Sequence, residues 1–202
     1  MKSLLLYAFL LSGVGAVRSG SEWVLKKDKG WIKVYSRHSD ISKFNDIRIE
    51  TDLPGTILQL TSILLDIEKY PEWGYSLKSC EVVKKVSPHE IIYYSEVWVP
   101  WPANNRDFYA DLRLMVDTVG GNLHVISIGL KDYPVRKNIS RIPMSRGVWN
   151  VSTLPGGRIH LSYVLQVDPG GSLPAWLLNL FATRGPLETF ENLRKKMESL
   201  NR

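Results

Sequence analysis

The chain has 202 residues, 44% of them hydrophobic, and its 26 basic and 20 acidic side chains give a formal net charge of +6. This length suits one domain with a substantial core. The basic residues are scattered and form no stripe with interleaved aromatics, which argues against nucleic-acid binding. Cys80 is the single cysteine, so an internal disulfide is excluded.

Residues 1–16 have the pattern of a secretory signal peptide. Lys2 precedes an apolar run over residues 4–11, and small residues follow it through residue 16. The run is too short to span a bilayer comfortably. We expect cleavage near residue 16, export to the periplasm or the exterior, and a single domain over residues 17–202. An uncleaved interfacial anchor is the alternative.

The first half of the mature chain predicts two strands followed by a helix. Apolar residues alternate over residues 31–37 and 44–52, which predicts strands. They recur at spacings of three and four over residues 56–66, which predicts a helix. Tyr70-Pro71-Glu72-Trp73 then predicts a short turn or second helix, because proline disfavours helical geometry in the residue before it.

The second half predicts a meander of antiparallel strands, joined by short turns rich in glycine and proline. The expected strands cover residues 77–86, 90–99, 106–119, 122–130, 147–153 and 158–167. Phe108 to Val116 and Ile159 to Val167 alternate best, with every second residue apolar. One face of the sheet is therefore apolar and must be covered.

A C-terminal helix is the predicted cover. Residues 174–200 carry an apolar stripe at helical spacing that begins at Trp176 and ends at Met197. Gly185-Pro186 interrupts it and predicts a kink or break, because proline removes a backbone donor. The expected fold class is α+β: a helix-grip fold in which a curved antiparallel β-sheet wraps around a long C-terminal α-helix and leaves an internal hydrophobic cavity.

Three motifs in this order resemble the START domain, the lipid-transfer branch of the helix-grip superfamily. They are residues 70–73, residues 102–108 (Pro-Ala-Asn-Asn-Arg-Asp-Phe) and the stretch that begins Asp168-Pro169-Gly170-Gly171 and continues through the C-terminal helix. The resemblance covers residues 23–197 and implies a non-enzymatic protein that binds a lipid. The apparent export signal favours a bacterial member.

The chain departs from sterol-handling members at two positions. Those members place a buried arginine six residues after the Arg-Asp-Phe arginine and face it with an acidic residue. Here Leu112 stands at the first position, and the second falls near Tyr93. The resemblance therefore favours a fatty acyl chain or another undemanding lipid over a sterol.

Twelve residues are the predicted ligand contacts, because large aromatics on loops and strand ends suit a concave apolar site. They are Trp73, Tyr93, Trp98, Arg106, Phe108, Leu112, Leu114, Tyr163, Trp176, Leu177, Phe181 and Phe190. The natural gate is the helix over residues 174–182, hinging at Gly185-Pro186, together with the loop over residues 98–105.

Arg106 has two open interpretations. It shares strand parity with Phe108 and Leu112, so it points toward the cavity, where its forked donors would suit a lipid carboxylate or phosphate. The favoured interpretation is structural: Arg106 pairs with a carboxylate at the strand end and anchors the Trp101 loop, since an unpaired buried charge is costly.

Two other functions stay open beside lipid binding. A cyclase or hydratase acting on a polyketide-like substrate would need an acid or base in the cavity, for which His124, Tyr93, Tyr163 and Arg106 are the candidates. His124 shares parity with Ile126 and Ile128, which is compatible with burial, although a lone histidine is more often a hydrogen-bonded structural residue than a ligand. A partner-binding envelope module using the exposed Trp101 loop is the other.

No known nucleophile, phosphate-loop or metal motif is present, so we expect no cofactor and no metal. The expected partners are a lipid and, transiently, a membrane, with the protein a monomer.

Overall fold

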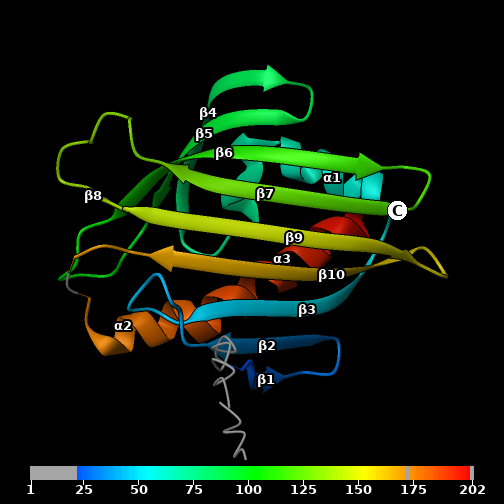
Figure 1. Cartoon of the computed structure of the whole chain (residues 1–202), viewed down its shortest axis with the longest axis horizontal. Helices are drawn as coiled ribbons and strands as arrows, with labels where there is room; N and C mark the ends of the chain where they lie inside the picture. The colour runs from blue at the N-terminus through cyan, green and yellow to red at the C-terminus, as the bar shows by residue number, and fades with distance from the viewer. Residues whose placement is uncertain (1–21, 172, 201–202) are drawn as a thin grey trace, which may run out of the picture.

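The computed structural model describes residues 22–171 and 173–200 of the chain. The expected signal peptide lies outside these residues. Within them, ten strands form one strongly curved sheet in the order β1-β2-β3-β10-β9-β7-β6-β5-β4, with β8 beside β6 (Figure 1). Neighbouring strands pair antiparallel, except for the parallel pair β6–β8.

The predicted meander is confirmed within a few residues at each strand end. The strands are β1 (Val24–Asp28), β2 (Ile32–Arg37), β3 (Asp46–Pro54), β4 (Leu77–Ser87), β5 (Glu90–Val97), β6 (Arg106–Asp117), β7 (Asn122–Leu130), β8 (Ser140–Arg141), β9 (Met144–Leu154) and β10 (Arg158–Asp168). Sequence alternation missed β1 and β8. Every residue of β1 is exposed and β8 has two residues, so neither carries a period-two pattern.

The predicted first helix is α1 (Ile57–Leu65), and a 3₁₀ helix, η1 (Ile67–Glu72), follows it. Thr56 begins α1 with a capping box: its hydroxyl accepts from the Gln59 N–H at 3.3 Å, and the Gln59 side chain accepts from the Thr56 N–H at 2.8 Å. The Tyr70 hydroxyl donates to the Leu64 carbonyl at 2.6 Å and ties the two helices together. Among the described residues, no helix is long and apolar enough to cross a membrane.

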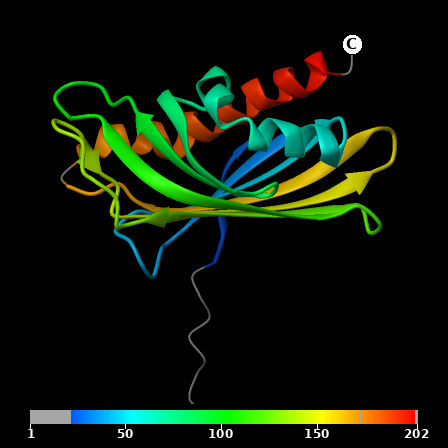
Figure 2. The same cartoon turned by 90° about the horizontal axis from the view of Figure 1, so that it is seen from above.

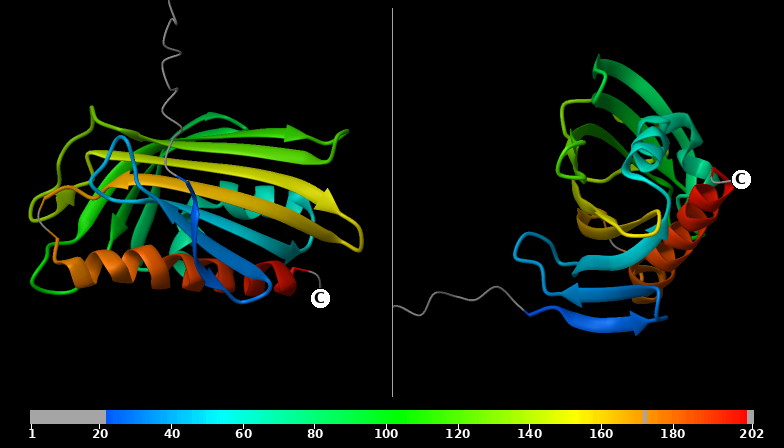
Figure 3. Two further views of the ribbon diagram at one scale, coloured as in Figure 1. Left: turned by 60° about the horizontal axis from the view of Figure 1, so that its bottom comes forward. Right: turned by 90° about the vertical axis from the view of Figure 1, so that its right-hand side faces the viewer.

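The C-terminal segment stays helical where a kink or break was predicted. It comprises α2 (Ala175–Asn179), a π-helical turn η2 (Leu180–Arg184) and α3 (Gly185–Ser199), which follow one another along the open side of the sheet (Figures 2 and 3). The Gly185 N–H donates to the carbonyl of Leu180, five residues earlier. The wider turn accommodates Pro186, which lacks an N–H and in a regular α-helix would clash with the preceding turn.

The π turn also changes which residues face the sheet. A turn with one extra residue rotates everything before it by about one position relative to an ideal helix. Leu177 is fully buried as a result, whereas Trp176 is 52% exposed. The apolar stripe predicted to begin at Trp176 is therefore wrong in its first turn and correct in α3, where Phe190, Leu193 and Met197 are buried.

The core lies between the concave face of the sheet and these helices (Figure 2). Ile159 and Leu161 of β10 and Leu112 of β6 are buried, as their alternation predicted. Each fully buried aliphatic side chain contributes about 1.5–3 kcal/mol from burial. The tight packing places the sheet and the helix at fixed positions on either side of a residual hollow.

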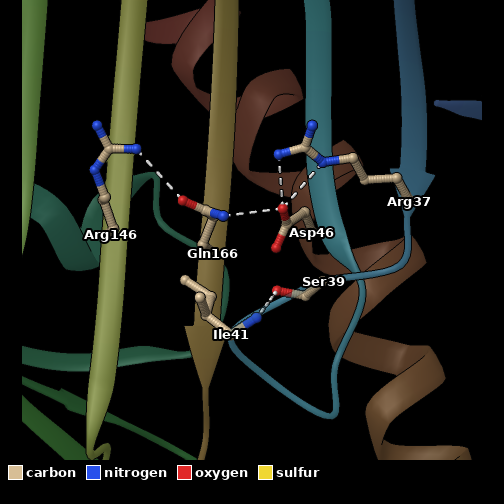
Figure 4. Close-up of polar contacts among 6 residues, drawn as sticks. All are labelled: Arg37, Ser39, Ile41, Asp46, Arg146 and Gln166. Carbon is tan, nitrogen blue, oxygen red and sulfur yellow. Dashed lines mark hydrogen bonds and ion pairs between the residues drawn. The ribbon is translucent and has the colours of Figure 1, made fainter. Parts of the chain in front are cut away.

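The convex face carries a polar chain across four adjacent strands, β9, β10, β3 and β2 (Figure 4). Arg146 donates to Gln166 at 3.4 Å, Gln166 donates to Asp46 at 2.9 Å, and Arg37 donates to the same carboxylate oxygen at 3.0 and 3.1 Å. These contacts link neighbouring strands on the outer side, which leaves the inner side for apolar contacts.

Candidate functional site

An internal cavity of about 530 Å³ lies between the concave face of the sheet and the segment α2–η2–α3. Most of its wall is apolar, with contributions from β3, β5, β6, β9, β10 and η1 as well as the helices. Its volume falls in the range of about 300–1,000 Å³ that is usual for small-molecule sites. The fold therefore provides a site for a hydrophobic molecule.

Eight of the twelve predicted contact residues line this cavity. They are Trp73, Tyr93, Arg106, Phe108, Leu112, Tyr163, Phe181 and Phe190. They come from five different elements and from the residue that follows η1, which shows that the sheet curvature and the helix bring together residues far apart in the sequence.

The other four predicted contacts do not line it. Trp98 and Trp176 point to solvent, each 52% exposed, because one lies in the loop after β5 and the other on the outer side of α2. Leu114 and Leu177 are buried but away from the hollow. Parity identifies the inner face correctly for Leu114, yet it cannot tell where along a strand the solid core gives way to the cavity.

The wall near Leu112 is neutral. The hydroxyl of Tyr93 is hydrogen-bonded to the Ser127 hydroxyl at 3.2 Å. Burial raises the pKa of Tyr93 to about 12, partly offset by that hydrogen bond, and burial also raises the pKa of Tyr163. Both phenols are uncharged at neutral pH. Sequence alternation missed Ser127, because its neighbours in β7 suggested the opposite face.

His124 lies on the outer face of the sheet, contrary to the burial that its parity with Ile126 and Ile128 suggested. The inward residues of β7 are instead Leu123 and Val125, at 1% and 0% exposed. The His124 Nδ1 lies 2.6 Å from the Asn150 side-chain oxygen of the neighbouring strand β9. Both faces of β7 carry apolar residues, so the sequence alone did not show which face points inward.

Arg106 lies in the cavity wall at the start of β6. The predicted pairing with a carboxylate is wrong, whereas the predicted contact with the Trp101 loop is present, through the carbonyl of Asn104. The Arg106 side chain is 5% exposed, and no carboxylate among the described residues lies within ion-pairing distance of it. Its Nη1 donates to the Asn104 carbonyl, and its buried Nε has no partner. Burial lowers the pKa of Arg106, as expected for a cation without a counter-charge.

Asp107, the next residue, forms the ion pair that was predicted for Arg106. Its carboxylate points outward and accepts from Arg141 at 2.7 and 3.3 Å. Arg141 also donates to the carbonyls of Tyr133 and Pro134 at 3.2 and 2.6 Å. The loop before β8 is thereby fixed to the outside of β6, and its anchor is Arg141.

The charges of the cavity wall have one sign. Lys43, which is exposed, and Arg106 line it, and its described lining includes no Asp or Glu. Among the described residues, no group of three or more His, Cys, Asp or Glu side chains could hold a metal ion.

One side of the helix closes the cavity through contacts that sequence reasoning missed. The Tyr75 ring meets Phe181 edge-on with centroids 5.8 Å apart, and the Tyr75 N–H donates to the Thr189 hydroxyl at 3.0 Å. Gly185 packs against Tyr75, since a β-carbon there would lie 3.1 Å from its ring. These contacts join the turn after η1 to the π turn itself and to α3, which follows it.

A sequence model of the START domain matches residues 16–202. The STAR-related lipid transfer protein of Xanthomonas axonopodis has a similar structure, with a TM-score of 0.77 and 29% identity, covering 87% of this chain and 98% of that one. Phosphatidylcholine transfer protein of Mus musculus is 24% identical over 191 residues, 91% of this chain and 87% of that protein. An aromatase/cyclase from Streptomyces sp. R1128 shares the fold, with a TM-score of 0.57, 14% identity and coverage of 78% and 95%.

Proposed function

Because the chain belongs to the START domain family, we propose that its cavity binds one lipid molecule and carries it without catalysis. The observation that supports this function is the mostly apolar hollow of about 530 Å³ beneath the C-terminal helix. Burying an acyl chain contributes about 0.8 kcal/mol per methylene, so an apolar wall alone holds a lipid firmly.

Catalysis has less support. The cavity lining of described residues holds no histidine, aspartate or glutamate, and His124 is on the outer face. Its buried tyrosines, Tyr93 and Tyr163, have raised pKa values and make poor bases at neutral pH. A cyclase or hydratase mechanism would lack a proton acceptor here.

We further propose that lipid exchange occurs at the end of the molecule where α2 and the loop after β5 lie (Figure 1). Trp98 and Trp176 are each 52% exposed there, and Trp101 of the same loop is 89% exposed. Tryptophan favours the interface between membrane and water. Transient contact with a membrane through these side chains, and opening of α2–η2 away from Tyr75, would release the ligand.

Export and a monomeric state belong to the same proposal. A periplasmic or secreted carrier needs a leader, which residues 1–16 supply by their pattern. Carriage of one enclosed lipid requires no second copy of the chain.

The test is to fill the cavity from the helix. Ala182 lines the hollow, and its neighbour Thr183 is exposed on the other side of the same turn. Ala182→Trp should abolish lipid retained through purification, measured by native mass spectrometry and by extraction. Thr183→Trp is the matched control and should retain lipid as the wild type does.

Two outcomes would contradict the proposal. One is a wild-type protein that takes up no lipid when incubated with vesicles. The other is lipid retained equally by a folded Ala182→Trp variant, which would place the lipid outside the cavity. Circular dichroism and a thermal melt establish that both variants are folded.

A further inference from the structure

Arg106 is the one buried cation of the cavity wall in the described chain, and it lacks a counter-charge. Its guanidinium carries five N–H donors, of which the structure pairs one nitrogen, Nη1, with the Asn104 carbonyl. Nε is buried without a partner, and Nη2 has no acceptor among the described residues. An unpaired buried charge is costly, and proteins retain such a group where something else pairs with it.

Three acidic residues at the same end of the sheet make contacts with other groups. Asp107 points to the opposite face and pairs with Arg141 at 2.7 Å. Glu96, also on the outer face, accepts from Lys78 at 2.9 Å and from Asn105 at 2.6 Å. Asp168, in the segment that closes over this end of the cavity, accepts from the Gly170 N–H at 2.9 Å. Within the described chain, no carboxylate forms an ion pair with Arg106.

The position of Arg106 suits a lipid headgroup. It is the first residue of β6, at the end of the cavity beside α2, and the segment around Gly171 passes next to it: a side-chain carbon at Gly171 would lie 3.8 Å from Nη2. Toward the middle of β6, the wall turns neutral at Phe108 and Leu112. The cavity therefore runs from one cationic group near its proposed exit to an apolar interior.

Building on the proposed function, we propose that the ligand is an anionic lipid whose phosphate or carboxylate binds Arg106 while its acyl chains extend toward Leu112. The forked guanidinium matches both oxyanions, since each presents two oxygens to parallel N–H donors. A charged hydrogen-bonded contact of this kind corresponds to about tenfold to hundredfold in affinity.

The experiment compares lipids that share their acyl chains and differ in whether the head group is an oxyanion or a neutral hydroxyl. Delipidated wild-type protein is incubated with vesicles that contain equal amounts of phosphatidic acid and diacylglycerol of matched chains, and separately with oleic acid and oleyl alcohol. Bound lipid is extracted and quantified by mass spectrometry. The wild type should take up the anionic member of at least one pair at least tenfold over its neutral match. Preference within the first pair identifies a phosphate, and preference within the second identifies a carboxylate.

Two variants test which cation causes the preference for anionic lipid. Arg106→Met should lose the anionic preference and take up the anionic and neutral members of each pair in equal amounts. Lys43→Met removes the other cation that lines the cavity, which is exposed at its rim, and should change the preference less than twofold. A preference that persists in Arg106→Met, or that is lost in Lys43→Met instead, overturns the assignment to Arg106.

Failure of this inference differs from failure of the proposed function. Wild-type protein that binds anionic and neutral lipids equally contradicts the anion site and leaves lipid carriage intact. Wild-type protein that binds none of the four lipids contradicts lipid carriage itself, and the anion site with it.

Discussion

Adjacent residues at the start of β6 meet opposite environments. On the outer face, Asp107 is fully buried and its carboxylate is held by Arg141, which is itself bonded to two backbone carbonyls. On the inner face, Arg106 is 5% exposed and meets a single carbonyl. The strand alternation separates two opposite charges that would otherwise neutralise each other.

The difference shows how the chain divides stability and binding between two faces of one strand. On the outer face, Asp107 and Arg141 neutralise each other. Stacked rings lie beside them: the Tyr109 and Tyr133 centroids are 4.4 Å apart, and Arg141 lies over Tyr109. The inner cation has its remaining donors free for a ligand. Arg106 is held in position before a ligand binds, and the unfavourable free energy of burying its charge is offset by the rest of the fold.

Breaking the outer pair should have the largest effect. Arg141→Met leaves Asp107 buried without a partner, so the free energy of unfolding should fall by about 3–5 kcal/mol. Urea denaturation followed by circular dichroism measures it. Arg113→Met, on the exposed part of β6, removes surface pairs to Asp111 and Glu90 and should cost less than about 1 kcal/mol. Equal losses of unfolding free energy in the two variants would mean that burial of Asp107 does not increase the cost of removing its partner.

Tyr93 on the inner face should make the free energy of unfolding decrease at alkaline pH. Tyr93 is 6% exposed, and its pKa is raised from 10.0 to about 12 by burial. A raised folded-state pKa means that the neutral form stabilises the fold, so stability is fully present below pH 10 and is lost as the pH rises toward 12. Tyr93→Phe should flatten this decline by about one proton, roughly 1.4 kcal/mol per pH unit.

Ser127→Ala is the control for that measurement. It removes the hydrogen bond to Tyr93 and leaves the titrating phenol in place, so the alkaline decline should stay as steep as in the wild type. Urea midpoints measured from pH 9 to pH 12 report both variants. An unchanged slope in Tyr93→Phe would show that Tyr93 ionises as freely in the fold as in the unfolded chain.

A smaller effect is expected from the ring stack on the outer face. Tyr133→Leu keeps an apolar side chain and loses the stacking on Tyr109, which should cost about 1 kcal/mol. Val135→Ala, two residues on and 69% exposed, should stay within about 0.5 kcal/mol of the wild type in the same thermal melt. A loss for Tyr133→Leu no larger than for Val135→Ala would show that the ring stack contributes nothing measurable to holding the loop.

Sequence reasoning found the fold and eight residues of the cavity wall, because the sheet and its cover follow from local periodicity. The alternation of β6 and β10 fixed the inner face, and the stripe of α3 fixed its cover. Sequence reasoning failed where the helical period is interrupted and where both faces of a strand are apolar. A π turn before Pro186 moved Leu177 inward in place of Trp176, and apolar residues on both faces of β7 hid the outward position of His124.

The partners of Arg106 and Asp107 could not be read from sequence for a different reason. Arg141 lies 34 residues beyond Asp107 and reaches it through a parallel strand of two residues, β8. A strand of two residues is too short to show a periodic pattern, so the sequence does not indicate this pairing. Without it, sequence reasoning assigns Arg106 an unnamed carboxylate at the strand end and finds no partner for Asp107.

Removing the inner cation should have the smallest effect on stability and is the sharpest test of the contrast. In lipid-free protein, Arg106→Met replaces an unpaired buried charge with an apolar chain of similar length, which relieves a desolvation cost. It also loses the bond to the Asn104 carbonyl, about 1 kcal/mol in the other direction. The free energy of unfolding should therefore equal or slightly exceed that of the wild type, measured by urea denaturation after delipidation. A loss of about 3 kcal/mol, as expected for Arg141→Met, would instead make Arg106 a structural anchor with a partner, because only a satisfied buried charge stabilises the fold that contains it.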